Sequence, residues 1–325
     1  MRRARLDVLR DWRFWLLAIA GLSLVVALVM PRLTLTRQAR DLLLVIDVTG
    51  SMNVRDYIEG GEPVSRLATA KRAARALLAE LPCQSRLGLA IFTERRSFLL
   101  FEPAEVCENF AAMDGAIDTI DWRMAWEGDS YVARGLHSAL AIADSLPADL
   151  VFLTDGQEAP PLAGGELPAY EGEPGKVTGL LVGVGAAEPS PIPKYNEDGR
   201  EIGFYAEQDV PQENRSGPPP ADAPSRAGWN PRNAPWGGEP ATGTEHLSAM
   251  REEALRRLAA QTGLGFAALR DPAALSAAVE ADTRAHPVEV RVDISGIPAG
   301  LALLALTALF GLGALTGRRP ERLPA

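Results

Sequence analysis

The stretch DLLLVIDVTGS, residues 41–51, decides the predicted fold. Its LLLVI part contains no polar residue, which is typical of a central parallel strand covered by helices on both faces. A carboxylate and two hydroxyls follow at alternate positions, at Asp47, Thr49 and Ser51. Because the chain leaves the strand here, we expect these oxygens at the carboxyl edge of a sheet, where open α/β sheets bind ligands.

Strands and helices alternate after this stretch. The predicted strands cover residues 41–47, 86–93, 97–101, 149–154 and 177–184, and the predicted helices cover residues 65–81, 104–120, 131–146, 246–261 and 272–281. Ser65 is a suitable cap for the first helix, and Pro82 ends it. The alternation predicts an α/β fold with a doubly wound, mostly parallel sheet of Rossmann-like type, in which the hairpin at 86–101 adds an antiparallel edge strand.

Composition limits the class of protein. The 325 residues are 47% apolar, which is enough for one large buried core with additions. The formal net charge of -9 argues against nucleic acid as a partner, because nucleic-acid binding needs a concentrated positive field.

Two uncharged apolar runs predict two transmembrane helices, at residues 14–33 and 297–315. The runs themselves read FWLLAIAGLSLVVALVM at 14–30 and IPAGLALLALTALFGLGAL at 297–315. Both are close to the roughly 20 apolar residues that cross a bilayer. A cleaved signal peptide is the alternative for the first run, but no A-x-A-like cleavage site follows it. We therefore expect two membrane anchors.

Arginines near the chain ends predict the orientation. They are Arg2, Arg3, Arg5, Arg10 and Arg13 before the first run, and Arg318, Arg319 and Arg322 after the second. The positive-inside tendency then makes residues 1–13 and 316–325 cytoplasmic tails and places the domain between the spans outside the cytoplasm. Arg32, Arg37 and Arg40 put positive charge on the other flank as well, which opposes this inference.

A Pro- and Gly-rich insertion occupies residues 186–243. Its first part, IPKYNEDGREIGFY at 192–205, has Glu197-Asp198-Gly199 between strand-like flanks and predicts a small hairpin. Its later part, residues 206–243, has no periodicity, so we expect it to be ordered only where something binds or packs on it.

Two further oxygen-bearing residues complete a candidate metal site. Asp155 follows the strand at 149–154, and Ser130 precedes the helix at 131–146. Taken alone, DVTGS is compatible with a helix cap and TDG with a plain turn. Their order and spacing favour a cluster of hard oxygen ligands, which suits Mg²⁺ or Ca²⁺.

These residues resemble the von Willebrand A-domain family and its metal-ion-dependent adhesion site, over about residues 41–282. The DxSxS pattern of the family matches Asp47, Thr49 and Ser51, with Thr49 in place of a Ser; Ser130 in GDS stands in place of the Thr of the family. Asp155 matches the last carboxylate. The resemblance implies direct coordination by Ser51, Ser130 and Thr49. It implies contact through water for the two aspartates, and an open position for an Asp or Glu of a protein partner.

A closer resemblance covers most of the chain. The segments RLATAKRAARALLAELP, GLAIFTERRSFLLFEPAEVC, DWRMAWEGDS and VFLTDGQEAPP are similar to membrane A-domain proteins of the MxaL type. That resemblance implies an inner-membrane protein whose periplasmic domain assists maturation or calcium insertion of methanol dehydrogenase. The partners would be the dehydrogenase or other maturation proteins.

Two alternatives remain open. The segment PIPKYNEDGREIGF and the two apolar runs are also similar to Bat-type A-domain proteins, which act with MoxR-type ATPases. A direct calcium chaperone, in which the metal is cargo, is the other alternative. We expect no enzyme in any of these cases, because no Ser-His-Asp or Cys-His arrangement, phosphate loop or dinucleotide fingerprint is present.

The two cysteines, Cys83 and Cys107, are candidates for a disulfide outside the cytoplasm. A hairpin turn near Glu94 and Arg95 would pair residue 86 with about residue 103, which brings the two sulfurs together. Two separate buried thiols are the alternative. Without a nearby pair of histidines, we do not expect a zinc site.

Four tryptophans are candidates for binding a partner. Trp122 and Trp126 precede Ser130, and Trp229 and Trp236 lie in the insertion, which we expect at the metal-bearing edge. Packing in the core or in a lid is the alternative for each. His137 lies within a predicted helix, where we expect it to pack rather than catalyse.

Overall fold

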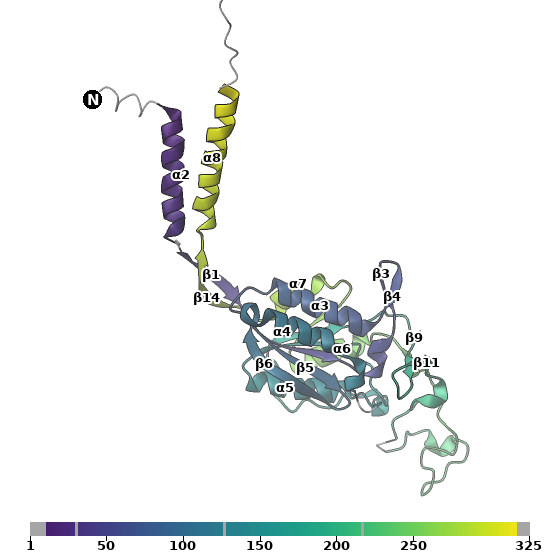
Figure 1. Cartoon of the computed structure of the whole chain (residues 1–325). Helices are drawn as coiled ribbons and strands as arrows, with labels where there is room; N and C mark the ends of the chain where they lie inside the picture. Colours follow the sequence, from purple (N-terminus) through teal and green to yellow (C-terminus); the bar gives the residue numbers. More distant parts are fainter. Residues whose placement is uncertain (1–10, 30–31, 126–127, 216–217, 317–325) are drawn as a thin grey trace, which may run out of the picture. The chain divides into compact units, whose positions relative to one another are not determined.

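The structure is a computed structural model that describes residues 11–29, 32–125, 128–215 and 218–316 (Figure 1). It divides into two compact units. One consists of residues 38–286 and contains the sheet; the other consists of the chain on either side, residues 1–37 and 287–325.

A six-stranded sheet forms the centre of the 38–286 unit, with the strand order β13-β8-β7-β2-β5-β6. The strands are β2 (Asp41–Asp47), β5 (Arg86–Thr93), β6 (Arg96–Glu105), β7 (Asp149–Thr154), β8 (Gly179–Gly183) and β13 (Gly265–Ala268). Neighbouring strands are parallel except for β6, which runs antiparallel to β5 at the edge. The predicted fold class of this domain is confirmed.

Helices cover both faces of the sheet (Figure 1). One face carries α3 (Arg66–Glu80), α4 (Val106–Thr119) and α7 (Ala274–Asp282), and the other carries α5 (Val132–Ser145) and α6 (Glu252–Thr262). In β2, Leu42, Leu44 and Ile46 enter the first core, whereas Leu43 and Val45 enter the second. This burial on both sides explains the unbroken apolar run of β2, since alternate side chains of a strand point to opposite faces.

The strand order reverses beside β2. From β2 the chain passes through α3 to β5 and β6 on one side, and then returns to β7 on the other side of β2. Such a reversal opens a crevice outside the carboxyl ends of the two strands. Asp47, the last residue of β2, and Asp155, the first residue after β7, therefore lie at the same edge of the sheet.

Several elements differ from the sequence prediction, among them α6 and β13. The helix predicted at 246–261 begins only at Glu252, because residues 247–248 form a short strand, β12 (Leu247–Ser248), that pairs with β9 (Ser190–Pro191). Strand β13 was not predicted, because GFAA contains one aromatic residue and no β-branched residue.

The insertion begins with the predicted hairpin, formed by β10 (Pro193–Tyr195) and β11 (Glu201–Phe204). A second small hairpin, β3 (Tyr57–Glu59) with β4 (Glu62–Val64), precedes α3. The later part contains the short 3-10 turns η4 (Glu207–Asp209) and η5 (Ala223–Ser225). Arg226 holds it together, because its guanidinium bonds Glu213, Asp222 and the carbonyl of Trp236.

The other unit contains two apolar helices that pack side by side, α2 (Trp12–Leu28) and α8 (Gly296–Thr316). Their flanks form a two-stranded sheet, β1 (Arg32–Ala39) with β14 (His286–Asp293). By length and composition, Gly296–Gly313 qualifies as a membrane span, whereas α2, with 17 residues, is shorter.

The first predicted span, 14–33, is therefore too long at its end. Residues 32–33 belong to β1, where Leu33 and Leu35 alternate with Thr34 and Thr36 in the manner of a strand. Residues 1–10 and 317–325, which carry most of the flanking arginines, lie outside the described residues. That the chain has two membrane spans, and their orientation, remain predictions.

A disulfide joins Cys83, in the turn before β5, to Cys107 in the first turn of α4. The hairpin turn falls at 94–95, since Thr93 pairs with Arg96. Arg86 pairs with Glu105, however, and not with residue 103, because irregularities on either side of Leu89 shift the register. The cysteines still meet, with Cα atoms 5.2 Å apart.

Replacing both cysteines by serine is expected to lower the free energy of unfolding of the 38–286 domain by about 3 kcal/mol, because the cross-link closes a loop with a sequence separation of 24. Urea unfolding of the variant and of the oxidised wild-type domain measures this difference. Equal midpoints would show that the cross-link contributes nothing to stability.

Candidate metal site

The loop after β2 holds Asp47 in one orientation. The backbone N–H and the hydroxyl of Thr49 donate to Oδ1 at 2.8 and 2.7 Å, and the hydroxyl of Thr154 donates to Oδ2 at 2.6 Å. Ser51, in the turn η1 (Gly50–Asn53), places its Oγ 3.5 Å from Oγ1 of Thr49. Through these contacts, the oxygen-bearing side chains of Asp47, Thr49 and Ser51 converge. All three residues are buried.

Ser130 reaches the same edge of the sheet through its backbone. Its N–H donates to the carbonyl of Ala159 and its carbonyl accepts from the N–H of Ala159, both at 2.7 Å. Because Ala159 lies four residues after Asp155, this pairing joins Ser130 to the loop that carries Asp155. The Oγ of Ser130 is buried and has no hydrogen-bond partner among the described residues.

Asp155 directly follows β7 and is fully buried. Its Oδ1 accepts the N–H of Gln157 at 3.0 Å, while its Oδ2 accepts from the guanidinium of Arg66 at 2.7 Å and from the hydroxyl of Ser248 at 3.2 Å. The carboxylate is thus held by its own loop, by the start of α3 and by β12.

Burial, together with the nearby carboxylate of Asp155, raises the pKa of Asp47 from 3.8 to about 7. The hydrogen bonds from Thr154 and Thr49 act in the opposite direction and lower this pKa. Two neighbouring buried carboxylates are unfavourable unless a cation compensates them. The backbone of Ser130 pairs with that of Ala159 in the loop after Asp155, and its buried hydroxyl has no hydrogen-bond partner among the described residues. This set of hard oxygens fits Mg²⁺ or Ca²⁺.

Sequence reasoning missed Arg66, Asp56, Ser248 and Thr154. Arg66 is fully buried and bonds both Asp56 and Asp155. One signal could have found it: Arg66, Ala70, Ala73 and Leu77 share the buried face of α3 at helical spacing. A charged residue on such a face requires a buried partner. No comparable pattern marks Ser248 or Thr154.

The tryptophans have different surroundings. Trp122, in η2 (Trp122–Met124), stacks on Tyr195 of β10 with ring centroids 4.4 Å apart, and η1 adjoins both η2 and β10. Trp126 lies outside the described residues. Within the insertion, the N–H of Trp229 donates to the carbonyl of Arg226 and the carbonyl of Trp236 accepts from the guanidinium of Arg226, and Trp229 is 37% exposed.

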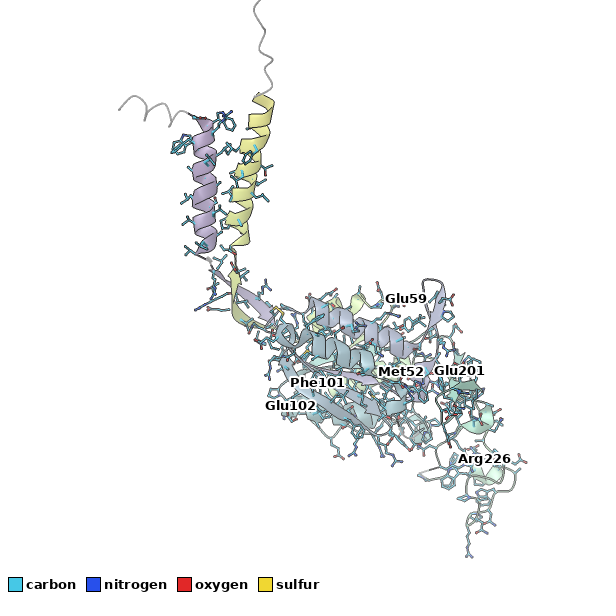
Figure 2. The ribbon with its side chains drawn as sticks, in the orientation of Figure 1. Met52, Glu59, Phe101, Glu102, Glu201 and Arg226 are labelled. Carbon is cyan, nitrogen blue, oxygen red and sulfur yellow. A yellow bond between two sulfur atoms is a disulfide. The ribbon has the colours of Figure 1, made fainter. Side chains whose placement is uncertain are left out.

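The β10–β11 hairpin is also fixed to the segment after η1, because Arg55 forms an ion pair with Glu201. Figure 2 shows Glu201 and Met52, the latter in η1, at the same end of the domain. The hairpin and Trp122 therefore border the turn that carries Ser51.

His137 lies on α5 away from these residues. Its ring packs against Tyr170 with centroids 4.9 Å apart, beside a cavity of about 510 Å³ that both residues line. Burial lowers the pKa of His137. These surroundings support the packing role predicted for it.

Glu158 caps the start of α5, where the N–H of Ala133 donates to its Oε1 at 2.8 Å. Burial raises the pKa of Glu158 to about 7, although the backbone N–H groups of Ala133 and Val132 favour the ionised form. The folded state therefore binds this proton more tightly than the unfolded state does. Its stabilising contribution is complete below pH 4.5 and is lost as the pH rises through 7.

Glu158→Gln is accordingly expected to make the metal-free 38–286 domain less sensitive to alkaline pH. The unfolding free energy of wild type relative to the variant should fall by up to about 3 kcal/mol between pH 4.5 and pH 8. Urea unfolding in chelator at both pH values tests this, with the exposed Glu253→Gln as control. Parallel pH profiles for wild type and Glu158→Gln would refute the expectation.

Comparison with known protein families gives one match: residues 42–157 match the von Willebrand factor type A domain. That range contains all five predicted metal ligands, Asp47, Thr49, Ser51, Ser130 and Asp155. No curated protein matches the chain.

Several solved structures are similar to this chain. One is an aerotolerance-related membrane protein from Bacteroides fragilis, with 13% identity, a TM-score of 0.45, and coverage of 75% of this chain and 98% of that one. A second is a von Willebrand factor type A protein from Catenulispora acidiphila, with 15% identity, a TM-score of 0.40, and coverage of 83% of this chain and 45% of that one. A third is an uncharacterized membrane-spanning protein from Vibrio fischeri, with 17% identity, a TM-score of 0.29, and coverage of 72% of this chain and 92% of that one. At such identities and scores, these likenesses carry no information on function.

Proposed function

We propose that this von Willebrand factor type A domain protein is a metal-dependent protein-binding module, attached to a membrane through its apolar helices. The observation that carries the proposal is the buried Oγ of Ser130, which has no hydrogen-bond partner among the described residues and belongs to a residue paired with the loop of Asp155. Thr49, Ser51 and Ser130 would hold Mg²⁺ or Ca²⁺, and Asp47 and Asp155 would balance its charge through water. The ion would supply the positive charge that attracts an Asp or Glu of the partner.

The chain's own residues prepare this role. Thr49 and Thr154 fix both oxygens of Asp47 before any ligand arrives, and Arg66 and Gln157 do the same for Asp155. Prior fixation lowers the entropy lost on binding. The oxygens of the site suit cation coordination, and we propose binding and not catalysis.

The rim around Ser51 would contact the rest of the partner. Trp122 and Tyr195 form a stacked aromatic pair next to η1, and aromatic residues of this kind are common anchors in protein interfaces. The β10–β11 hairpin adds Ile202 and Phe204 of β11, which are 59% and 53% exposed.

Two partner classes follow from the resemblances in the sequence. The Bat-type reading pairs the protein with a MoxR-type ATPase. It is supported by the β10–β11 hairpin and by the apolar helices that precede and follow the domain in the sequence. The methanol dehydrogenase reading rests on sequence segments such as DWRMAWEGDS alone, and residues 126–127 of that segment lie outside the described residues. We therefore place the Bat-type reading first.

A crosslinked pull-down from growing cells, with and without chelator, tests the proposal. Wild type should recover a protein partner in a metal-dependent manner, and chelator or Ser130→Ala should lower the recovery by about tenfold or more. Ser145→Ala, an exposed serine at the other end of α5, is the matched control. Recovery that neither chelator nor Ser130→Ala changes would contradict a metal-dependent module.

The identity of the captured partner separates the readings. An ATPase supports the Bat-type reading, and methanol dehydrogenase or its maturation proteins support the other. The calcium-chaperone alternative predicts instead that radiolabelled calcium passes from the purified protein to apo-dehydrogenase. Absence of transfer would exclude the metal as cargo.

A further inference from the structure

Arg66 uses its whole hydrogen-bonding capacity inside the protein. A guanidinium carries five N–H donors, and Arg66 makes five hydrogen bonds. Nε and Nη2 donate to Asp56 at 2.9 and 2.7 Å, Nη1 donates to Asp155 and to the hydroxyl of Ser248 at 2.7 and 2.6 Å, and Nη2 donates to the carbonyl of Ser248 at 3.0 Å. The side chain is fully buried, so water does not replace any of these bonds.

The chain at the start of the insertion lies against the guanidinium of Arg66. The N–H of Ala186 donates to Oδ2 of Asp56 at 2.8 Å, on the same oxygen that Arg66 binds. Gly185 has φ +116°, and a Cβ atom there would lie 2.5 Å from Nε of Arg66. A glycine is therefore required for the close approach of the chain to Arg66.

The returning end of the insertion is bonded to the loop of Asp155. Ser248 donates to Oδ2 of Asp155, Arg251 donates its N–H to the carbonyl of Asp155 at 2.8 Å, and Nε2 of Gln157 donates to the carbonyl of Glu245 at 3.0 Å. Strands β9 and β12 pair with each other, which brings the two ends of the insertion together. We call residues 185–191 and 245–251 the neck of the insertion.

We propose that Arg66 is a positioning residue that couples the metal site to the neck of the insertion, so that metal binding at Asp155 changes the order of the neck. The inference rests on the proposed metal-binding function. One carboxylate oxygen, Oδ2 of Asp155, is shared by Arg66 and Ser248, so any redistribution of its charge toward a metal changes both bonds. Coupling between two sites is reciprocal, and a weaker neck lowers metal affinity by the same factor.

The experiment is hydrogen exchange of the full chain in lipid nanodiscs, with Mg²⁺, with Ca²⁺ or with chelator, alongside calorimetric measurement of the metal Kd. In wild type, metal should change the amide exchange of the neck. Ser248→Ala removes the hydroxyl that joins Arg66 to Asp155 and should weaken metal binding by about tenfold and diminish the exchange change in the neck. Ser276→Ala in α7, a buried serine whose hydroxyl has no partner among the described residues, is the control and should leave both unchanged.

Two further variants separate positioning from a structural role. Gln157→Ala removes the bond to Glu245 without altering any charge, and Arg66→Lys keeps the charge but has three donors for five acceptor contacts. Both should reduce the metal-dependent exchange change in the neck, even at temperatures where the variants are fully folded.

Several outcomes would overturn the inference. If wild type binds metal but the exchange of the neck stays the same, or if Ser248→Ala and Gln157→Ala respond to metal as wild type does, the coupling fails while the proposed function stands. If wild type binds neither ion, the proposed function fails and the coupling with it.

Discussion

Replacing Arg66 by methionine is expected to lower the free energy of unfolding of the 38–286 domain by about 3 to 5 kcal/mol. The guanidinium is fully buried and forms ion pairs with Asp56 and Asp155, both at 2.7 Å. Removing it leaves two buried carboxylates without a cation and breaks the bonds to Ser248. The loss of compensation for the two buried charges, more than the loss of packing, causes the destabilisation.

Arg75→Met in the same helix is the control. Arg75 binds Asp114 with two short hydrogen bonds, but the side chain of Arg75 is 41% exposed and that of Asp114 27% exposed. Exposed ion pairs of this kind are worth about 0 to 1 kcal/mol. Urea unfolding in chelator should therefore show a large loss for Arg66→Met and a small one for Arg75→Met. Losses of equal size would mean that the buried network does not stabilise the domain.

Asp47→Asn is expected to abolish stabilisation by Mg²⁺ or Ca²⁺ while making the metal-free domain more stable at pH 8. A ligand that binds only the folded state stabilises it by about 2.7 kcal/mol at 100 times its Kd. The wild-type domain should gain this amount, and Asp47→Asn should gain none, because one of its two site carboxylates is lost. Thermal unfolding with and without metal measures both effects.

The sign of the metal-free effect follows from the pKa of Asp47, which burial and Asp155 raise to about 7 from 3.8. The folded state holds this proton more tightly than the unfolded state, so stability falls as the pH rises from about 4 through 7. Asparagine carries no charge at any of these pH values, so the stability of Asp47→Asn does not fall in this way. Equal metal-dependent shifts of melting temperature in wild type and variant would contradict the proposed ligand role of Asp47.

The strands at the centre of the sheet were predictable because each is buried on both faces. Residues 41–47 and 149–154 form strands with the predicted bounds, since an unbroken apolar run of that length suits few other structures. The cap of α3 was equally clear, because the hydroxyl of Ser65 accepts the N–H of Ala68 at 3.2 Å. Local chemistry was sufficient in these cases.

Long-range pairing was less accessible from the sequence. The start of α6 moved to Glu252 because residues 247–248 pair with β9, almost sixty residues earlier in the chain. The irregularities around Leu89 shifted the pairing of β5 with β6 without any local signal. Both features depend on contacts between segments that periodicity within one segment does not report.

The candidate site likewise contains residues that the sequence predicts and residues that only the structure reveals. Asp47, Thr49, Ser51 and Asp155 follow directly from where their strands end. The partners that hold Asp155, Arg66 and Ser248, come from a helix and from the far end of the insertion, and only the fold brings them to one carboxylate. Sequence therefore predicted the candidate ligands, which stay a prediction, whereas the structure was needed to find the residues that position Asp155.

The most direct test of the central claim is calorimetric titration of the full chain with Mg²⁺ and Ca²⁺, for wild type and for the double variant Asp47→Asn/Ser130→Ala. Our account predicts saturable binding at a single site in wild type and none in the variant, since the variant loses a carboxylate and the hydroxyl for which the described residues offer no hydrogen-bond partner. Absence of binding in wild type, or unchanged binding in the variant, would contradict it.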